Sequence, residues 1–532
     1  MAGHGGAGRC TGTADGLARG LAATSRSIRR HWMLIILLTA GLALRVLTQL
    51  AYRPALLYID SPKYLVAGLE KFDPQGYRVL LLKPVLAAGN LALVAAVQHL
   101  IGLAMAVTVY TVLIRRHTPR WAAALAAAPL LLDAYQLQME QTIMPDVLFE
   151  ALILTGLAVL LWNPRPGLRA IAVASFVLGL SATVRQVGEI LFLPALVFAV
   201  LAARGWGRRL TVGGLVVTSF AIPILVYMTY SATMLGDRFQ LSDQGDGVLY
   251  GRAAAAADCA ALRIPAHLRA VCPTPKDLAA FGIDGLVNDP RAPVYTSALP
   301  AGVSRAGAAV QFSYRVFEQQ PLRVAGSVAG DAVKLFALTR DSVPGDTPLW
   351  RWQFQTAYQL YPPAITLPYA SALIRDTGGG GPGAARPLAS FLRAYQLHGG
   401  YTPGPYLLLA LLAGLAGLGG LIRSRDRTAA LACLLATGTG VAVLLGADFY
   451  EFSWRYQLPA LVTLPAAGAL GVAAVAARIR QRVAARATGA ALGNGPGWPQ
   501  PPVTLVGCRT EVINRTSAPS GPGSYTKTAG SG

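Results

Sequence analysis

The chain has 532 residues, of which 54% are hydrophobic and 13% are charged, and its formal net charge is +21 at pH 7. Such an apolar composition excludes an ordinary soluble protein of this size. The basic residues lie in short connections between apolar blocks, a pattern that sets membrane topology and does not indicate nucleic-acid binding. We therefore predict an all-α polytopic membrane protein surrounded by membrane lipids.

The apolar blocks are each roughly 16 to 22 residues long, about the length that crosses a bilayer core as a helix. We expect about ten membrane-spanning helices, at 33–51, 86–114, 121–138, 147–162, 168–184, 190–203, 210–230, 405–422, 428–447 and 456–477. The predicted domains are a disordered cytoplasmic N-terminus, seven helices with outward loops, an extracytoplasmic insert, three further helices and a disordered cytoplasmic tail. Their boundaries are 1–32, 33–230, 231–403, 404–480 and 481–532.

Arginine-rich connections alternate with arginine-poor connections along the chain. Short loops rich in Lys and Arg stay in the cytoplasm. The arginine-rich connections lie at 115–120, 165–169, 204–209, 423–427 and 478–482. The rule therefore places both termini in the cytoplasm of a cell-membrane protein. The loops that face outward are 52–85, 133–146, 185–189, 231–403 and 448–455.

The five cysteines lack the spacing of a metal site, so we predict no metal bound through sulfur. The sequence identifies no cofactor and leaves dependence on a divalent cation open. Cys259 and Cys272 both fall in the predicted outward insert, where an oxidising compartment permits a disulfide. We predict this disulfide; the alternative is two buried free thiols.

Three carboxylates in the outward loops are candidate catalytic groups. Asp60 follows the first predicted helix, although an Asp before Ser-Pro is also a good turn or helix-cap residue. Asp146 follows Pro145 at the start of the fourth predicted helix, where an acid also stabilises the helix N-terminus. Glu140 has no such local role, but it can be a solvated loop residue.

Three cations fall on the same predicted membrane face and could hold an anion: Lys83, Arg185 and Arg455. Each one alone could instead anchor its loop at the membrane interface. Arg45 lies inside the first predicted helix, where a charge is costly unless it is paired, lines a polar cavity or snorkels to the interface. Asp60 or another acid is a candidate partner for Arg45.

Acids and cations on one membrane face suit a transfer that releases a lipid phosphate. A carboxylate can take the proton of an incoming hydroxyl, which typically contributes about 10² to 10⁴ in rate. Lys or Arg can neutralise the phosphate as its negative charge develops. Because nucleotide sugars are mainly cytoplasmic, an outward-facing transferase needs a donor carried in the membrane.

The sequence resembles the C-type (GT-C) glycosyltransferases that use polyprenyl-phosphate sugars, especially the protein O-mannosyltransferase and lipid A aminoarabinose transferase family. Asp60, in Tyr-Ile-Asp-Ser-Pro-Lys-Tyr-Leu, is similar to the family's proposed catalytic base. Lys83-Pro84 is similar to its phosphate-contacting Lys-Pro. Asp146 is similar to the acid that opens the fourth helix.

A late Arg-Tyr-x-x-Pro pattern is also similar, with Arg455 and Tyr456 in its first two positions and Pro459 in its last. The resemblance covers the overall plan to about residue 480 and implies a GT-C-like fold. It departs from the mannosyltransferases at Ser61, where they have Glu, so protein mannosylation does not follow.

The resulting hypothesis is an inverting glycosyltransferase with Asp60 as the general base. Asp146 and Glu140 would orient the acceptor or assist the base, and Lys83, Arg185 or Arg455 would hold a polyprenyl-phosphate sugar. The supporting residues would be Arg45, Tyr64 and Tyr456. The acceptor could be a glycan, a lipid or a protein. The alternatives are a multi-pass transporter or flippase for a lipid-linked or anionic substrate, and a noncatalytic scaffold that presents the insert.

Overall fold

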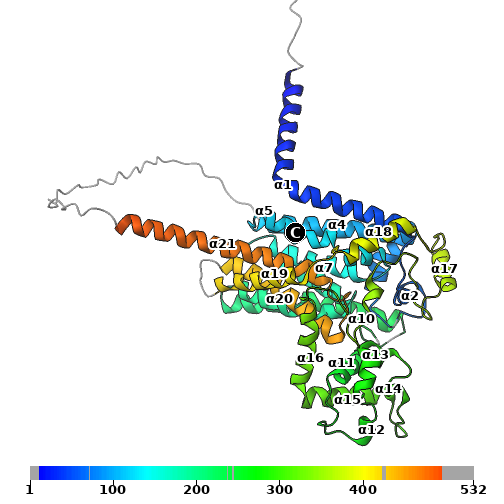
Figure 1. The fold of residues 1–532 in the computed structure, drawn as a ribbon. Coiled ribbons are helices and arrows are strands. Elements are labelled where there is room, and N and C mark those ends of the chain that lie inside the picture. The colour runs from blue at the N-terminus through cyan, green and yellow to red at the C-terminus, as the bar shows by residue number, and fades with distance from the viewer. Residues whose placement is uncertain (1–10, 71, 237, 243–244, 422–426, 494–532) are drawn as a thin grey trace, which may run out of the picture. The chain divides into compact units, whose positions relative to one another are not determined.

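Helices form nearly all the regular structure in the computed structural model of this chain (Figure 1). The structure describes residues 11–70, 72–236, 238–242, 245–421 and 427–493. Of these residues, those up to 480 belong to one compact unit and those from 481 to a second. The fold and the site described below belong to the first unit.

Five helices are long and apolar enough to cross a membrane by length and composition. They are α1 (Thr11–Ala51, with its apolar part at Arg29–Ala51), α4 (Leu91–Arg115), α10 (Trp206–Met234), α20 (Arg427–Tyr450) and α21 (Pro459–Gly493). They make the chain a polytopic membrane protein, as predicted.

The other predicted spans correspond to shorter helices. These are α5 (Arg120–Leu132), α7 (Asp146–Leu161), α8 (Leu168–Ala182), η2 with α9 (Gln186–Leu191 and Phe192–Ala202) and α19 with η4 (Gly404–Gly417 and Leu418–Gly420). Each is below the length that ordinarily crosses a bilayer unaided. The total of ten spans therefore stays a prediction.

Both predicted disordered ends are partly helical. Helix α1 begins at Thr11, within the segment 1–32, and has one non-helical residue at His31. Helix α21 continues to Gly493, beyond the predicted start of the tail at 481. Residues 1–10 and 494–532 lie outside the described residues.

The insert predicted at 231–403 has two parts with different cores. The first contains α11 (Gly245–Ala256), α12 (Ala266–Arg269), α13 (Pro275–Asn288), α14 (Pro293–Thr296), α15 (Arg305–Gln319) and α16 (Pro321–Lys334). Tyr250, Leu286 and Phe312 pack together in its own apolar core, and these helices form one group in Figure 1. The predicted disulfide between Cys259 and Cys272 is confirmed.

The second part of the insert packs into the membrane-helix core. It contains η3 (Leu349–Trp352), α17 (Leu367–Asp376), β2 (Gly383–Ala384) and α18 (Arg386–Leu397). Trp352 belongs to the same buried cluster as residues of the long helices. Strand β2 pairs antiparallel with β1 (Tyr52–Arg53), directly after α1. The insert is therefore built partly into the unit that carries the site.

Candidate functional site

Two outward loops are tied together by hydrogen bonds. The Leu56 amide donates to the Gln141 carbonyl at 2.9 Å, and the Ile143 amide donates to the Leu56 carbonyl at 3.0 Å. The buried Ser61 hydroxyl donates to the Ile143 carbonyl at 2.9 Å and accepts from the Tyr58 amide at 2.8 Å. Ser61, the residue that departs from the mannosyltransferase pattern, thus joins the two acid-bearing loops.

These ties place Asp60 near Asp146. Asp60 immediately precedes the short helix α2 (Ser61–Leu65), whose first turn contains Pro62. Asp146 is the first residue of α7 and follows α6 (Ala134–Gln141) by a short turn. An acid is favourable at a helix N-terminus, so the position stabilises α7 while it aims the carboxylate at the site.

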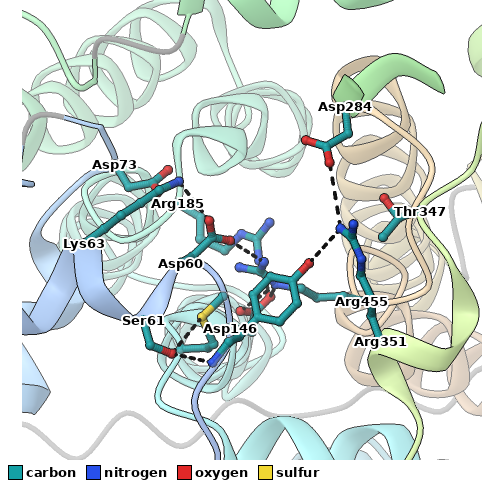
Figure 2. A network of polar contacts seen from close by, with 12 residues as sticks. Asp60, Ser61, Lys63, Asp73, Asp146, Arg185, Asp284, Thr347, Arg351 and Arg455 are labelled. Carbon is teal, nitrogen blue, oxygen red and sulfur yellow. Dashed lines mark hydrogen bonds and ion pairs between the residues drawn. The ribbon is translucent and has the colours of Figure 1, made fainter. Parts of the chain in front are cut away.

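Arg455 connects the two carboxylates. Its Nε lies 3.0 and 3.1 Å from the two Asp146 oxygens, and its Nη1 lies 3.0 Å from Asp60 Oδ2. Arg185, directly before η2, also donates a hydrogen bond to Asp146. Arg455 follows α20 and precedes α21, so segments far apart in the sequence meet here (Figure 2).

Lys63 holds the other side of Asp60. Its Nζ lies 2.8 Å from Asp60 Oδ1 and 2.8 Å from Asp73 Oδ2, and Figure 2 shows Asp60 between Lys63 and Arg455. Burial alone would raise the pKa of Asp60, but the attraction of Lys63 and Arg455 outweighs it and holds that pKa well below its usual range. Burial raises the pKa of Asp73, despite the attraction of Lys63.

The network lines a cavity of about 540 Å³. Arg185, Asp60 and Arg455 lie on its membrane-helix side, together with Tyr64 and Tyr456. The Arg455 guanidinium lies over the rings of three aromatic residues, with centroid distances of 5.3 to 5.7 Å, namely Tyr456, Trp352 and Tyr58. These rings help to hold the guanidinium in place, and its charge is shared between Asp60 and Asp146.

The insert supplies the other polar side of the cavity. Asp284 of α13 and Arg351 of η3 line it, and Arg351 Nη1 lies 3.8 Å from Asp284 Oδ2 and 3.4 Å from the Tyr58 hydroxyl. Glu451, directly after α20, also lines the cavity. Burial, assisted by Asp284, raises the pKa of Glu451 to about 8, so this group is largely uncharged at pH 7.

Glu140 and Arg45 lie outside this cavity. Glu140 accepts from Arg45 Nη2 at 2.7 Å and contacts His99 Nδ1 at 2.8 Å, and all three side chains are buried. Gly102 of α4 gives this pair room, because a Cβ there would lie 2.0 Å from Glu140 Oε1. Arg45 therefore does have an acid partner, but it is Glu140 rather than Asp60.

Lys83 is also placed away from the cavity. It is the first residue of α3 (Lys83–Leu86), after the π-helical turn η1 (Arg78–Leu82), and its side chain is exposed. Among the described residues it has no carboxylate partner and does not line the cavity. Lys63, which sequence reasoning left out of the site, holds Asp60 instead.

Sequence reasoning also missed Asp73, Asp284, Arg351 and Glu451. Lys63 could have been found, because it lies three residues after Asp60 and so shares its side of a short helix. Asp284 and Arg351 come from the insert and have no local sequence signal. Among the described residues, no group of three or more His, Cys, Asp or Glu side chains is arranged to hold a metal ion.

Comparisons with known proteins give two structural neighbours. No family model and no curated protein matches the chain. One neighbour is an archaeal oligosaccharyltransferase, AglB from Archaeoglobus fulgidus, solved with an inhibitory peptide and a dolichol-phosphate. It is 12% identical with a TM-score of 0.35, and the match covers 89% of this chain. That match covers 53% of AglB, so this chain spans about half its length.

The second neighbour is ArnT from Cupriavidus metallidurans bound to undecaprenyl phosphate. It is 14% identical with a TM-score of 0.29, and the match covers 82% of this chain and 77% of ArnT. Both neighbours are similar to this chain over most of its length. At these TM-scores neither likeness carries an argument about function, which rests on the geometry of the site.

Proposed function

We propose that this chain is a membrane glycosyltransferase that moves a sugar from a polyprenyl-phosphate donor to an acceptor hydroxyl. The observation that carries the proposal is Asp60, which is 22% exposed at the cavity and bonded on either side by Lys63 and Arg455. A base for the acceptor and cations for a phosphate thus lie within one hydrogen-bonded group.

The reaction is a single displacement at the anomeric carbon of the donor sugar. The acceptor oxygen forms the new bond as the bond from the anomeric carbon to the phosphate oxygen breaks. The electron pair of that bond leaves with the polyprenyl phosphate, and the acceptor proton passes to Asp60. One displacement inverts the configuration of that carbon.

The cations support donor binding and departure. Arg455 and Arg185 hold the phosphate, with Lys63 as the third cation in place of Lys83. Phe149, Val443 and Ala447 also line the cavity and give the lipid an apolar boundary. Asp146 keeps Arg455 and Arg185 in position through its hydrogen bonds to both.

Donor binding also prepares the base. Without donor, Asp60 is a weak base because Lys63 and Arg455 lower its pKa. A phosphate that draws these cations away removes attraction from Asp60 and adds a negative charge nearby. Both effects raise the pKa of Asp60 towards a useful range for proton transfer. The base therefore becomes effective when the donor is present.

The orientation follows the distribution of arginines. We infer that both termini are cytoplasmic and that the cavity opens on the outer side of the cell membrane. Cysteine labelling on intact and permeabilised cells tests this orientation. Labelling of insert positions only from the cytoplasmic side contradicts it.

The transporter hypothesis drew on a charge inside a membrane helix. Arg45 is that charge, and it is paired with Glu140 and bonded to the carbonyls of Leu130 and Leu131, while its buried Nε has no partner among the described residues. No observation in the described residues favours transport over transfer.

Release of polyprenyl phosphate tests the proposal. The purified protein in lipid nanodiscs is incubated with polyprenyl-phosphate mannose, glucose and arabinose, with and without a cell-envelope extract as acceptor source. We expect release that depends on both the donor sugar and the extract. In proteoliposomes made with the same protein, movement of intact donor between leaflets without release contradicts the proposal in favour of a flippase.

A further inference from the structure

The insert side of the cavity carries polar groups that the proposed donor does not use. Asp284 of α13, Arg351 of η3 and Thr347 lie on this side (Figure 2), and Asn288, which bonds to Asp284, also lines the cavity. We define the insert wall as Asp284, Asn288, Thr347, Arg351 and Trp352. All five line the same cavity as Asp60.

Hydrogen-bonding capacity on this wall is incompletely used. Arg351 Nη1 lies 3.4 Å from the Tyr58 hydroxyl and 3.8 Å from Asp284 Oδ2, both beyond the usual length of a hydrogen bond. Its Nε and the Trp352 Nε1 are buried without a partner among the described residues. These two atoms have no access to the open space of the cavity, so Arg351 Nη1, which is held only by the two long contacts, is the group suited to receive a ligand oxygen.

The wall combines a donor and acceptors. Arg351 donates, whereas the Asp284 carboxylate accepts and is 45% exposed. Asn288 donates to Asp284 Oδ1 at 2.8 Å, which fixes this carboxylate and leaves its Oδ2 towards Arg351. A sugar hydroxyl both donates and accepts, so it can bond to both Asp284 and Arg351.

Charge on the wall decides between neutral and anionic ligands. The Asp284 carboxylate lies within 3.8 Å of the Arg351 guanidinium and opposes the approach of a second anion to it. A neutral sugar instead uses both side chains. On the Arg455 side the cations are also paired with acids, but three of them, Arg185, Arg455 and Lys63, meet there. The wall has a single cation, Arg351, and an exposed carboxylate matches it.

We propose that the insert wall is the acceptor subsite and that it takes a neutral carbohydrate residue. This inference rests on the proposed transfer reaction, and it names the acceptor class as a glycan rather than a protein or a phosphate-bearing lipid. Tyr58 contacts Arg351 and lies two residues before Asp60, so the wall adjoins the base. A sugar bound there presents a hydroxyl to Asp60 while the donor phosphate occupies the opposite side.

The test measures binding of the two partners separately in nanodiscs. The carbohydrate probes are methyl glycosides of mannobiose, arabinobiose and maltose, compared with a sugar phosphate and a Ser/Thr peptide by saturation-transfer NMR. The lipid probe is polyprenyl phosphate. The variants are Asp284→Asn and Arg351→Gln, with Arg291→Gln as the matched control because that arginine is 81% exposed and lies outside the cavity lining.

We expect at least one neutral disaccharide to bind in preference to the sugar phosphate and the peptide. Each wall variant should weaken that binding by about tenfold or more, since each removes a hydrogen bond to a charged group. Both should retain polyprenyl phosphate binding, and Arg291→Gln should retain both affinities. Arg455→Gln should show the opposite pattern, with the lipid lost and the sugar retained.

Three results overturn the subsite: no neutral disaccharide binds, the peptide or the sugar phosphate binds preferentially, or the wall variants bind the disaccharide normally. Failure of the proposed reaction gives a different result. In that case disaccharide binding still depends on Asp284 and Arg351, but no donor yields polyprenyl phosphate.

Discussion

Substitution of Asp146 by Asn tests the buried ion pairs that build the site. The Asp146 side chain is 3% exposed and binds Arg455, which is 6% exposed, and Arg185, which is 16% exposed. Asn keeps the shape of the side chain but removes its charge. Arg185 then loses its carboxylate partner, whereas Arg455 keeps Asp60 at 3.0 Å.

The expected loss of unfolding free energy follows from the different fates of Arg185 and Arg455. Breaking a buried pair by removing one partner costs about 3 to 5 kcal/mol, because the other charge stays buried. Arg455 retains a partner and Arg185 is partly exposed, so we expect about 3 kcal/mol, at the lower end of that range. Turnover should fall as well, since Arg455 and Arg185 lose the group that positions them.

A double-mutant cycle separates the ion pair from other effects. Unfolding by SDS in mixed micelles is measured for Asp146→Asn, Arg185→Gln and the double variant. The double variant should be less destabilised than the sum of the single variants by about 1 to 3 kcal/mol, because the second substitution removes the unpaired charge. Asp289→Asn, which breaks an exposed pair with Arg291, is the control and should unfold like the wild type.

Additive effects would refute this reasoning. They would show that Asp146 and Arg185 do not interact in the folded protein. A loss of less than about 1 kcal/mol for Asp146→Asn would show that its charge acts only at the helix N-terminus, because a helix-terminal charge contributes no more than that at most sites.

Three further predictions concern the lysines, Glu451 and the disulfide. In donor-saturation kinetics, Lys63→Ala should raise the donor KM about tenfold or more while Lys83→Ala stays near wild type, and equal effects would contradict the assignment. The usual pKa of Glu451 is 4.5 and its pKa in the folded protein is about 8, so the folded protein binds more protons than the unfolded chain between these pH values. The free energy of unfolding therefore falls as the pH rises from about 4.5 to about 8. Glu451→Gln should reduce that slope in SDS unfolding curves, and an unchanged slope would contradict the pKa. Non-reducing peptide mapping of fresh membranes should recover Cys259 linked to Cys272, whereas two free thiols would contradict the disulfide.

The sequence was sufficient for the membrane class and for part of the site. Apolar blocks predict helices because the bilayer requires every backbone group to be hydrogen-bonded within the protein. The arginine pattern assigned one face to the loops that carry Asp60, Asp146, Arg185 and Arg455, and the structure brings these four side chains into one hydrogen-bonded group.

The rest of the site depends on packing that the sequence does not indicate. The sequence predicts that Glu140 is a loop acid. In the structure every residue of α6 is buried, and Glu140 of α6 forms an ion pair with Arg45 of α1. Lys83 and Lys63 both stand beside Pro, and the spacing of three residues from Asp60 is a local signal that favours Lys63. Asp284 and Arg351 reach the cavity because the insert packs on the membrane helices.

Turnover of the Asp60→Asn variant tests the central claim most directly. The variant keeps the size of the side chain but removes the base, and release of polyprenyl phosphate is measured alongside polyprenyl phosphate binding and thermal stability. The account predicts a folded protein that binds the lipid and turns over about 10² to 10⁴ more slowly than the wild type. Near-normal turnover by the folded variant would contradict the assignment of Asp60 as the catalytic base.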